Sequence, residues 1–230
     1  MKPFIERIIN VEQGSDEWKK ARAGRVTASR ISDILAKGKN GAEPACRRDY
    51  KMQLACEILT GVPQEDTFYS KDMQWGNEQE PYARAAYAAA EGVLVDVVGM
   101  TIHPKSDRCA ASPDGLVDWD GKSSPKRIVQ FKCPKTATHI GYIEAGVVPS
   151  DYRPQMYWEL ACTGAEVNDF ASFDPRLPEN IQLFIVPLPR DEQEIQRIER
   201  EVDVFLDEVD ILVAKLRKLG QEEPQEGSAA

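Results

Sequence analysis

The feature that most constrains this chain is a set of short predicted strands between residues 109 and 132. The segment "CAASPDGLVDWDG" has the pattern of a strand, a turn and a second strand, and "RIVQFKCP" has that of a further buried strand. Side chains two residues apart on a strand point to the same side, so we expect Gln130 and Lys132 to share one face. Asp114 is expected at the end of the neighbouring strand, close to both.

This order of residues points to phosphodiester chemistry. An acid on one strand and an acid-x-Lys on the next is a nuclease arrangement, and Gln130 stands where that chemistry needs a carboxylate. Carboxylates hold Mg²⁺ beside the scissile phosphate, and Lys132 can orient or deprotonate the attacking water. The backbone carbonyl of Phe131 can serve as another oxygen ligand, and Glu80 in "WGNEQEPYAR" can bring a carboxylate from a helix.

Each of these pieces also has an ordinary structural explanation. A PDG tripeptide is usually a turn, a lysine on a strand is usually an edge residue, and a glutamate on a helix is usually solvated. Their order and spacing together favour the nuclease interpretation over three unrelated coincidences.

The distribution of charge qualifies a net charge of −9, which at first argues against a nucleic-acid partner. Residues 190–230 carry 12 acids and 6 bases, whereas residues 19–51 carry 10 bases and 3 acids. A locally basic face on an acidic protein can bind a polyanion. The alternative is a solvated helix surface with a chance excess of bases.

The remaining pattern predicts an α/β (α+β) fold with a restriction-endonuclease-like core, in which a small mixed sheet of three or four strands is flanked by helices. Helical spacing is expected after Ser15, from Thr27 or Ser29 through "TASRISDILA", around residues 47–60, 71–92 and 150–164, and over 191–218. Further strands are expected in "VLVDVVGMTIHP" (93–104) and "FIVPLPR" (184–190). Pro81 predicts either a helix that starts near it or a bend. We expect one domain over residues 1–219 and a disordered acidic tail over 220–230.

The composition predicts a chain that does not enter a membrane. No window of the sequence is long and apolar enough to span a bilayer, and the N-terminus lacks the apolar core of a signal peptide. Five cysteines form no CxxC pair, which favours free thiols in a reducing cytosol.

Six blocks in order carry a more specific resemblance: "VEQGSDEWKKARAGRVTAS", "QWGNEQE", "CAASPDGL", "FKCP", "RPQMYW" and "FDPR". The chain resembles the lambda exonuclease-like, YqaJ-type viral recombinase family of the PD-(D/E)xK nuclease superfamily. The resemblance implies a 5′→3′ exonuclease that digests linear double-stranded DNA from a 5′-phosphate end to mononucleotides. It also implies two Mg²⁺ ions, for which Mn²⁺ can substitute, a ring-shaped homotrimer and a single-strand annealing protein as partner in recombination. The implied location is the cytoplasm of a bacterial host, with the gene carried by a phage or prophage.

The resemblance also assigns roles to individual residues. The metal-binding positions are Glu80, Asp114, Gln130 and Phe131, and the other catalytic positions are Lys132 and Gln155. The positions for the terminal 5′-phosphate are Arg22, Ser29, Ser112 and Thr138. Further DNA contacts are expected at Thr27, Met73, Lys135 and Tyr157, with Met73 where the family places an apolar residue that splits the duplex end.

Two positions depart from the family pattern. Gln130 stands in place of the family's glutamate, which removes one anionic ligand and should weaken Mg²⁺ binding and slow hydrolysis by orders of magnitude. We hypothesise that Gln130 is an engineered replacement of a glutamate; the alternative is a naturally inactive or divergent member. The second departure is near Thr138, where the family has an arginine that Lys135 or Thr138 replaces.

Three functions therefore follow from the sequence. The first is the exonuclease, inactivated or strongly impaired in this chain by Gln130. The second is a module that binds 5′-phosphorylated DNA ends without cutting them. A third is a restriction-type endonuclease, against which the predicted end-binding block "ARAGRVTAS" argues, since an endonuclease need not hold a terminal phosphate.

Overall fold

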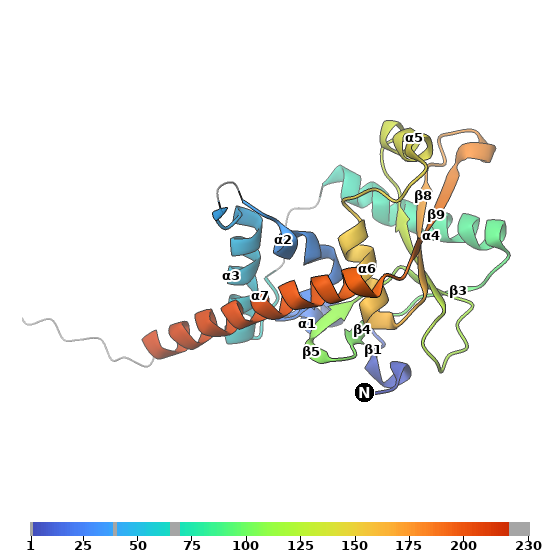
Figure 1. The fold of residues 1–230 in the computed structure, drawn as a ribbon. Coiled ribbons are helices and arrows are strands. Elements are labelled where there is room, and N and C mark those ends of the chain that lie inside the picture. Colours follow the sequence, from blue (N-terminus) through green and yellow to red (C-terminus); the bar gives the residue numbers. More distant parts are fainter. Residues whose placement is uncertain (1, 39–40, 65–69, 221–230) are drawn as a thin grey trace, which may run out of the picture.

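The computed structural model describes residues 2–38, 41–64 and 70–220, and it shows a mixed α/β protein with helices around two sheets (Figure 1). The expected fold class is confirmed. The expectation of one sheet of three or four strands is wrong, because the described residues form a four-stranded and a five-stranded sheet. The proposed tail boundary stays a prediction, since residues 221–230 lie outside the described part.

The five-stranded sheet positions the residues of the predicted nuclease centre. Its strand order is β3-β6-β7-β8-β9, and β7 runs antiparallel to β6 and parallel to β8. The smaller sheet has the order β1-β4-β5-β2. The strand bounds are β1 Ile8–Ile9, β2 Val26–Thr27, β3 Val95–Asp96, β4 Met100–His103, β5 Ser106–Ala111, β6 Gly115–Val117, β7 Arg127–Lys132, β8 Val167–Phe173 and β9 Leu183–Pro189.

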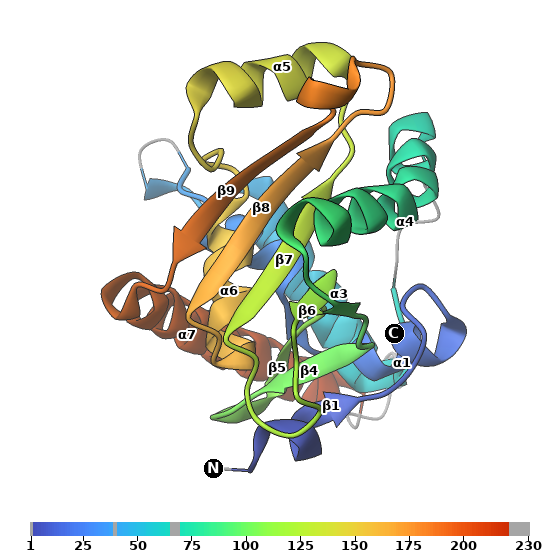
Figure 2. The same ribbon diagram turned by 90° about the vertical axis from the view of Figure 1, so that its right-hand side faces the viewer.

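Helices α4 and α6 cover opposite faces of the five-stranded sheet, with α4 across its front in Figure 2. The α-helices are α1 Asp16–Arg22, α2 Ile31–Leu35, α3 Ala45–Thr60, α4 Lys71–Glu91, α5 Thr136–Ala145, α6 Arg153–Thr163 and α7 Glu192–Leu219. The 3₁₀ turns are η1 Phe4–Arg7, η2 Ala28–Arg30 and η4 Glu179–Ile181. Alternation along β7 buries Val129 and Phe131 against α4, and Ile128 against α6.

Several local signals act as the sequence predicts. Ser15 caps α1 by accepting a hydrogen bond from the Trp18 N–H at 3.2 Å. Helix α3 ends at Gly61, whose φ of 69° is the left-handed conformation that glycine adopts without strain. Pro81 does not begin a helix, because α4 starts ten residues earlier behind the cap Ser70. The expected helix after Thr27 is shorter than its pattern indicates, and consists of η2 followed by α2.

Three strands have no counterpart in the sequence prediction. Strands β1 and β2 are two residues long, too short to show a period. Strand β8 is seven residues long and lies next to β7 in the sheet. It is the strand whose omission made the predicted sheet too small.

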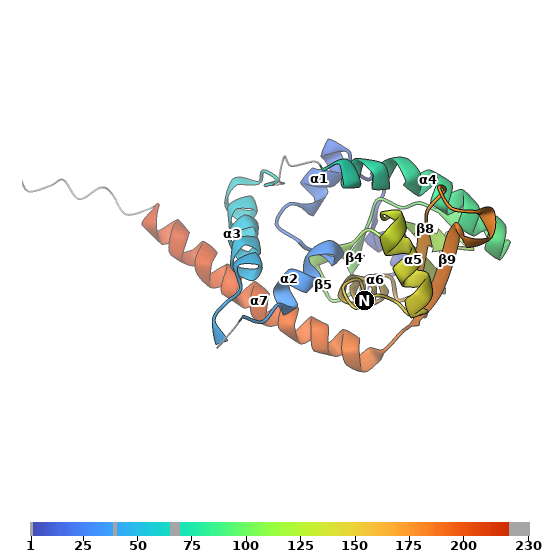
Figure 3. The same ribbon diagram turned by 90° about the horizontal axis from the view of Figure 1, so that it is seen from above.

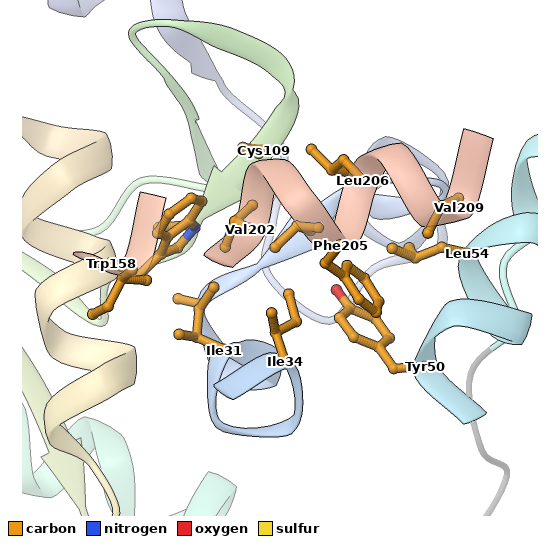
Figure 4. Packing of buried hydrophobic residues seen from close by; sticks show 14 of the residues in the cluster. Ile31, Ile34, Tyr50, Leu54, Cys109, Trp158, Val202, Phe205, Leu206 and Val209 are labelled. Carbon is orange, nitrogen blue, oxygen red and sulfur yellow. The ribbon is translucent and has the colours of Figure 1, made fainter. Parts of the chain in front are cut away.

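Helix α7 ties the N-terminal helices to the rest of the molecule. It runs along α2, α3 and α6, as the view from above shows (Figure 3). Its apolar residues recur at steps of three and four, as predicted, and they form one cluster with those of α2 and α3 (Figure 4). Within this cluster Phe205 stacks on Tyr50, with ring centroids 5.5 Å apart.

Replacing Phe205 by alanine should destabilise the protein strongly. The side chain is fully buried, and its removal leaves a cavity beneath Tyr50. We expect the free energy of unfolding to fall by about 3–5 kcal/mol in chemical denaturation. Val204→Ala is the control, since Val204 is 54% exposed and should change stability little. Equal effects of the two substitutions would contradict the packing described here.

No helix among the residues that the structure describes is both long and apolar enough to cross a membrane.

Candidate active site

The predicted nuclease residues meet in a cleft of about 430 Å³ at the end of strands β6 and β7. Asp114 immediately precedes β6, and its Oδ2 accepts a hydrogen bond from the Phe131 N–H at 2.7 Å. The described residues that line the cleft include Glu80, Asp114, Gln130, Phe131 and Lys132. The two strands that the sequence predicts to be neighbours therefore carry Asp114, Gln130 and Lys132 into one cleft, and helix α4 brings Glu80 to it.

Gly115 explains why the PDG turn is more than a turn. A Cβ at this glycine would lie 2.3 Å from Val95 Cγ1 and 2.9 Å from Val129 Cγ1. Those distances are far inside van der Waals contact, so a larger residue would push β6 away from β3 and β7. Glycine thus permits the close strand approach that places Asp114 against the backbone of β7.

The acids of the cleft are protonated more readily than free carboxyls. Burial raises the pKa of Asp114 to about 8, and the nearby Glu80 charge contributes to that rise. Burial also raises the pKa of Glu80, against the opposing charges of Arg84 and Lys132. The Arg84 guanidinium lies 2.5 Å from the Glu80 carboxylate. Two shielded acids that repel each other are an arrangement that a cation relieves.

The possible metal ligands of the nuclease cleft include two carboxylates, Glu80 and Asp114, where the nuclease arrangement has three. Among the described residues no group of three or more His, Cys, Asp or Glu side chains is placed to hold a metal ion. Glu80, Asp114 and the Phe131 carbonyl are hard oxygen donors of the kind that Mg²⁺ takes. Gln130 is buried and directs its side-chain nitrogen at Asp114 Oδ2. The residues present thus fit a hard divalent cation, with Gln130 presenting N–H groups where a ligand oxygen is needed.

Lys132 lines the cleft, and Gln155 is joined to it through Gln130. Gln155 Nε2 on α6 donates to Gln130 Oε1 at 2.8 Å. The Lys132 ammonium lies 4.9 Å from the centre of the Tyr152 ring, which holds it by a cation–π contact at the cleft wall. Burial raises the pKa of the neighbouring Cys133 to about 12, which opposes a nucleophilic thiolate at that residue.

A basic pocket of about 420 Å³ adjoins this cleft. Its described lining includes the bases Lys19, Arg22, Arg25 and Arg30, and Met73 lines both hollows. Four bases from the basic stretch of the sequence therefore gather around one pocket, whose lining also includes Glu57.

Arg22 is fixed toward this pocket by its neighbours. Its guanidinium carbon lies 4.0 Å above the Trp18 ring, and its Nη2 lies 3.4 Å from Thr27 Oγ1. Trp18 Nε1 in turn donates to Ser112 Oγ at 3.1 Å. The structure therefore brings Arg22 and Thr27 together in the pocket, while Ser112 is joined to them only through Trp18 and is not among the lining residues. Ser29 is exposed on the short turn η2.

A third hollow receives Thr138 and Lys135, and it supplies an arginine that sequence reasoning missed. It is lined by Trp75, Lys135, Thr138 and Arg176 among others, and shares Asp72 with the nuclease cleft. Arg176 lies 4.5 Å above the Trp75 ring, and Lys135 pairs with Asp72 at 2.9 Å. Arg176 belongs to the block "FDPR", so its presence in a matched block was the available signal. It brings a guanidinium to the hollow that Lys135 and Thr138 also line, and which residue takes the place of the family's arginine stays a prediction.

Tyr157 is placed away from these hollows. It is half-buried on α6, where it packs against three of the apolar clusters. The structure shows it in a packing role, and its predicted DNA contact stays a prediction.

The fold and the cleft define a PD-(D/E)xK-type α/β protein. The model of the YqaJ-like viral recombinase domain matches residues 17–166, and the chain belongs to this family. The comparison with curated protein sequences gives no match.

Solved structures extend the likeness to most of the chain. An alkaline exonuclease, LHK-Exo, from Laribacter hongkongensis is 39% identical, with a TM-score of 0.79 over 90% of this chain and 98% of that one. The structure of LHK-Exo in complex with dAMP is similar at 38% identity and a TM-score of 0.80, with the same coverage. A phage-related exonuclease from Haemophilus somnus 129PT shares the fold at 19% identity, with a TM-score of 0.61 over 84% of this chain and 96% of that one.

Proposed function

We propose that this protein is a 5′→3′ exonuclease that digests linear double-stranded DNA from a 5′-phosphate end and releases mononucleotides. The observation that carries the proposal is the basic pocket next to the acidic cleft, with Met73 in the wall of both. With the terminal 5′-phosphate bound in the basic pocket, the first phosphodiester of the strand would lie in the acidic cleft. The alkaline exonuclease with 39% identity supports the reaction class.

Mg²⁺ is the cofactor that we propose, as two ions in a form with glutamate at position 130, with Mn²⁺ as a substitute. Glu80, Asp114 and the Phe131 carbonyl would hold it, and when bound it supplies the positive charge that stabilises the negative charge developing on the scissile phosphate.

Lys132 would act on the attacking water. Its ammonium stands on the same β-strand as Gln130 and borders the same cleft as Asp114. A lysine there can hold the water by a hydrogen bond, take its proton, or screen the charge on the phosphate.

The basic pocket would hold the terminal phosphate. Arg22 offers a guanidinium fork, Thr27 a hydroxyl beside it, and Ser112 a hydroxyl reached through Trp18. Charge-assisted hydrogen bonds of this kind favour a phosphate dianion over a neutral hydroxyl end.

Gln130 favours a second function for this particular chain, that of a DNA-end binding module. The Gln130 amide is uncharged and turns its nitrogen toward Asp114, so it gives the cation no anionic ligand. The basic pocket keeps its lysine and arginine side chains. We therefore propose that this chain is an inactivated form of the exonuclease, with Gln130 in place of a glutamate.

The family supports an assembly and a partner for this function. We propose a homotrimeric ring around the DNA and cooperation with a single-strand annealing protein, in the cytoplasm of a bacterial host that carries the phage or prophage.

Binding of DNA ends tests this proposal without hydrolysis. This chain should bind a duplex with 5′-phosphate ends more tightly than one with 5′-hydroxyl ends, and Arg22→Gln should reduce that preference by roughly 10- to 100-fold, the worth of one or two hydrogen bonds to a charged group. The measurement is fluorescence anisotropy with the two duplexes.

Arg197→Gln is the matched control, because this arginine lies on α7 and pairs with Glu194 away from the pocket. It should leave the preference unchanged. Equal affinity of the unaltered protein for the two duplexes would refute the end-binding role of the pocket.

A further inference from the structure

A directed chain of hydrogen bonds runs from the backbone of α6 to the nuclease cleft. It begins at the Met156 carbonyl, which accepts from Asn168 Nδ2 at 3.2 Å. The same nitrogen donates to Glu159 Oε2 at 2.8 Å, and Glu159 Oε1 accepts from Gln155 Nε2 at 2.8 Å. Helix α6 and strand β8 thus surround the Glu159 carboxylate with amide donors.

The chain then continues to the cleft. Gln155 Nε2 also donates to Gln130 Oε1 at 2.8 Å, and Gln130 Nε2 donates to Asp114 Oδ2. The side-chain amides of Gln155 and Gln130 thus each have one orientation that satisfies these hydrogen bonds. Glu159 is fully buried, so water offers its carboxylate no alternative partner, and Gln130 is only 3% exposed where it borders the cleft.

The direction of this chain is set by its acceptors. A backbone carbonyl can only accept, so Asn168 must turn its NH₂ group toward Met156 and Glu159. An ionised carboxylate can only accept, so Gln155 must present its NH₂ group to Glu159. Because the same nitrogen faces Gln130, that side chain must turn its oxygen to Gln155 and its nitrogen to Asp114.

We propose that Glu159, acting through Gln155, is a positioning residue that holds Gln130 with its nitrogen toward Asp114 and its oxygen away from the cation position. This inference rests on the proposed function, since it concerns the cation of the nuclease cleft. An amide oxygen is an acceptable ligand for a hard cation, whereas an NH₂ group repels one. The weakness of the site in this chain therefore has two causes, the lost charge of position 130 and the orientation of its amide.

The ionised form of Glu159 is the one that imposes this direction. Burial raises the pKa of Glu159 to about 7, and the hydrogen bonds from Asn168 and Gln155 oppose that rise. At a pH of about 8.5 the carboxylate predominates, so the test is made there.

Glu159→Gln should reverse the direction of these hydrogen bonds. The substituted amide must give its oxygen to Asn168, so its NH₂ group faces Gln155. Gln155 can then turn its oxygen inward and accept from Gln130. When the cation is bound, the Gln130 oxygen can therefore turn toward it in place of the nitrogen that Asp114 and the Phe131 carbonyl now accept from. We expect Mn²⁺ to bind about tenfold more tightly, the effect of replacing a facing donor by a ligand oxygen. Loss of the buried Glu159 charge by itself would weaken cation binding. The sign of the change in Mn²⁺ affinity therefore distinguishes reorientation of the Gln130 amide from loss of that charge.

The same substitution in a Gln130→Glu protein is the matched control. A carboxylate has two oxygens and nothing to reverse, and a reversed Gln155 would set oxygen against oxygen. There Glu159→Gln should leave Mn²⁺ affinity unchanged or lower it. Gln155→Met in this chain is a second route to the same end, since it removes the donor that holds the Gln130 oxygen and adds no charge. It should also tighten Mn²⁺ binding.

The experiment is isothermal titration calorimetry of the full-length proteins with Mn²⁺, without DNA, at the pH of about 8.5 at which Glu159 is ionised. Asp114→Asn is the blank, and thermal unfolding checks that each variant is folded. Tighter binding from Glu159→Gln in the Gln130 protein alone supports the inference. If the Gln130→Glu protein binds Mn²⁺ but Glu159→Gln tightens nothing in the Gln130 protein, the inference is wrong and the proposed function stands. If the Gln130→Glu protein itself binds no Mn²⁺ beyond the blank, the proposed metal site fails, and the inference fails with it. Should Glu159→Gln not fold, Gln155→Met decides by the same criteria.

Discussion

Gln130→Glu is expected to raise the rate of mononucleotide release from 5′-phosphorylated linear duplex by at least ~100-fold in Mg²⁺, the scale on which a lost metal contact changes activity. The substitution puts an oxygen where Gln130 Nε2 now faces Asp114, and it adds the anion that the site lacks. Gln155 needs no adjustment, because its Nε2 can donate to a carboxylate as it does to the amide oxygen.

The measurement is the initial rate of acid-soluble nucleotide release for the two proteins at equal concentration. Adding Asp114→Asn to the Gln130→Glu protein is the control and should abolish the gain, since it removes another anionic ligand. Equal digestion by this chain and by its Gln130→Glu variant would show that an amide suffices at this position. Two inert proteins that both bind DNA ends would instead support the end-binding module.

Lys132→Met in the Gln130→Glu protein is expected to lower turnover by roughly 10²–10⁴-fold, the range for loss of a positioned proton-transfer group. Methionine keeps an unbranched side chain of similar length beside Tyr152 but has no group that can hold or deprotonate water. Binding of 5′-phosphorylated duplex should stay within a few-fold, because the basic pocket is unchanged. Single-turnover digestion and anisotropy with Ca²⁺ in place of Mg²⁺ separate the two quantities.

Lys126→Met supplies the comparison for that experiment. Lys126 is exposed immediately before β7, at the end of the strand remote from Lys132. It should leave turnover unchanged. A Lys132→Met enzyme that retains most of its turnover would remove this lysine from the proposed mechanism.

The elements that the sequence predicts well are those whose signals are local. Helix α7 follows from apolar residues at steps of three and four, and it runs over Glu192–Leu219 against an expected 191–218. Strand β8 could not be found in this way, because its buried positions include Asn168, Asp169 and Ser172. Each is compensated by a distant partner: Glu159 for Asn168, Tyr87 for Asp169 and His139 for Ser172. A period-2 apolar pattern is absent when tertiary hydrogen bonds allow polar residues into the core.

The same distinction applies to the site. Asp114, Gln130 and Lys132 follow from spacing on neighbouring strands, and the structure places all three on one cleft. Glu159 reaches the site region only through the packing of α6, which no local pattern encodes. Arg176 lies in the matched block "FDPR", but its place beside Trp75 depends on the packing of the segment after β8. The direction of the Gln130 amide is a still more distant consequence, since it depends on a sequence of contacts that begins at a backbone carbonyl.

The central claim, that this chain is a form of a 5′→3′ duplex exonuclease disabled at position 130, is tested most directly by the polarity of digestion. The Gln130→Glu protein is given linear duplexes labelled at either the 5′ or the 3′ end of one strand, with Mg²⁺, and labelled products are resolved by size. We expect the 5′ label to appear first, as a mononucleotide, while this chain with Gln130 releases little label but remains bound to the ends. Early release of the 3′ label, or internal fragments from either duplex, would contradict the central claim.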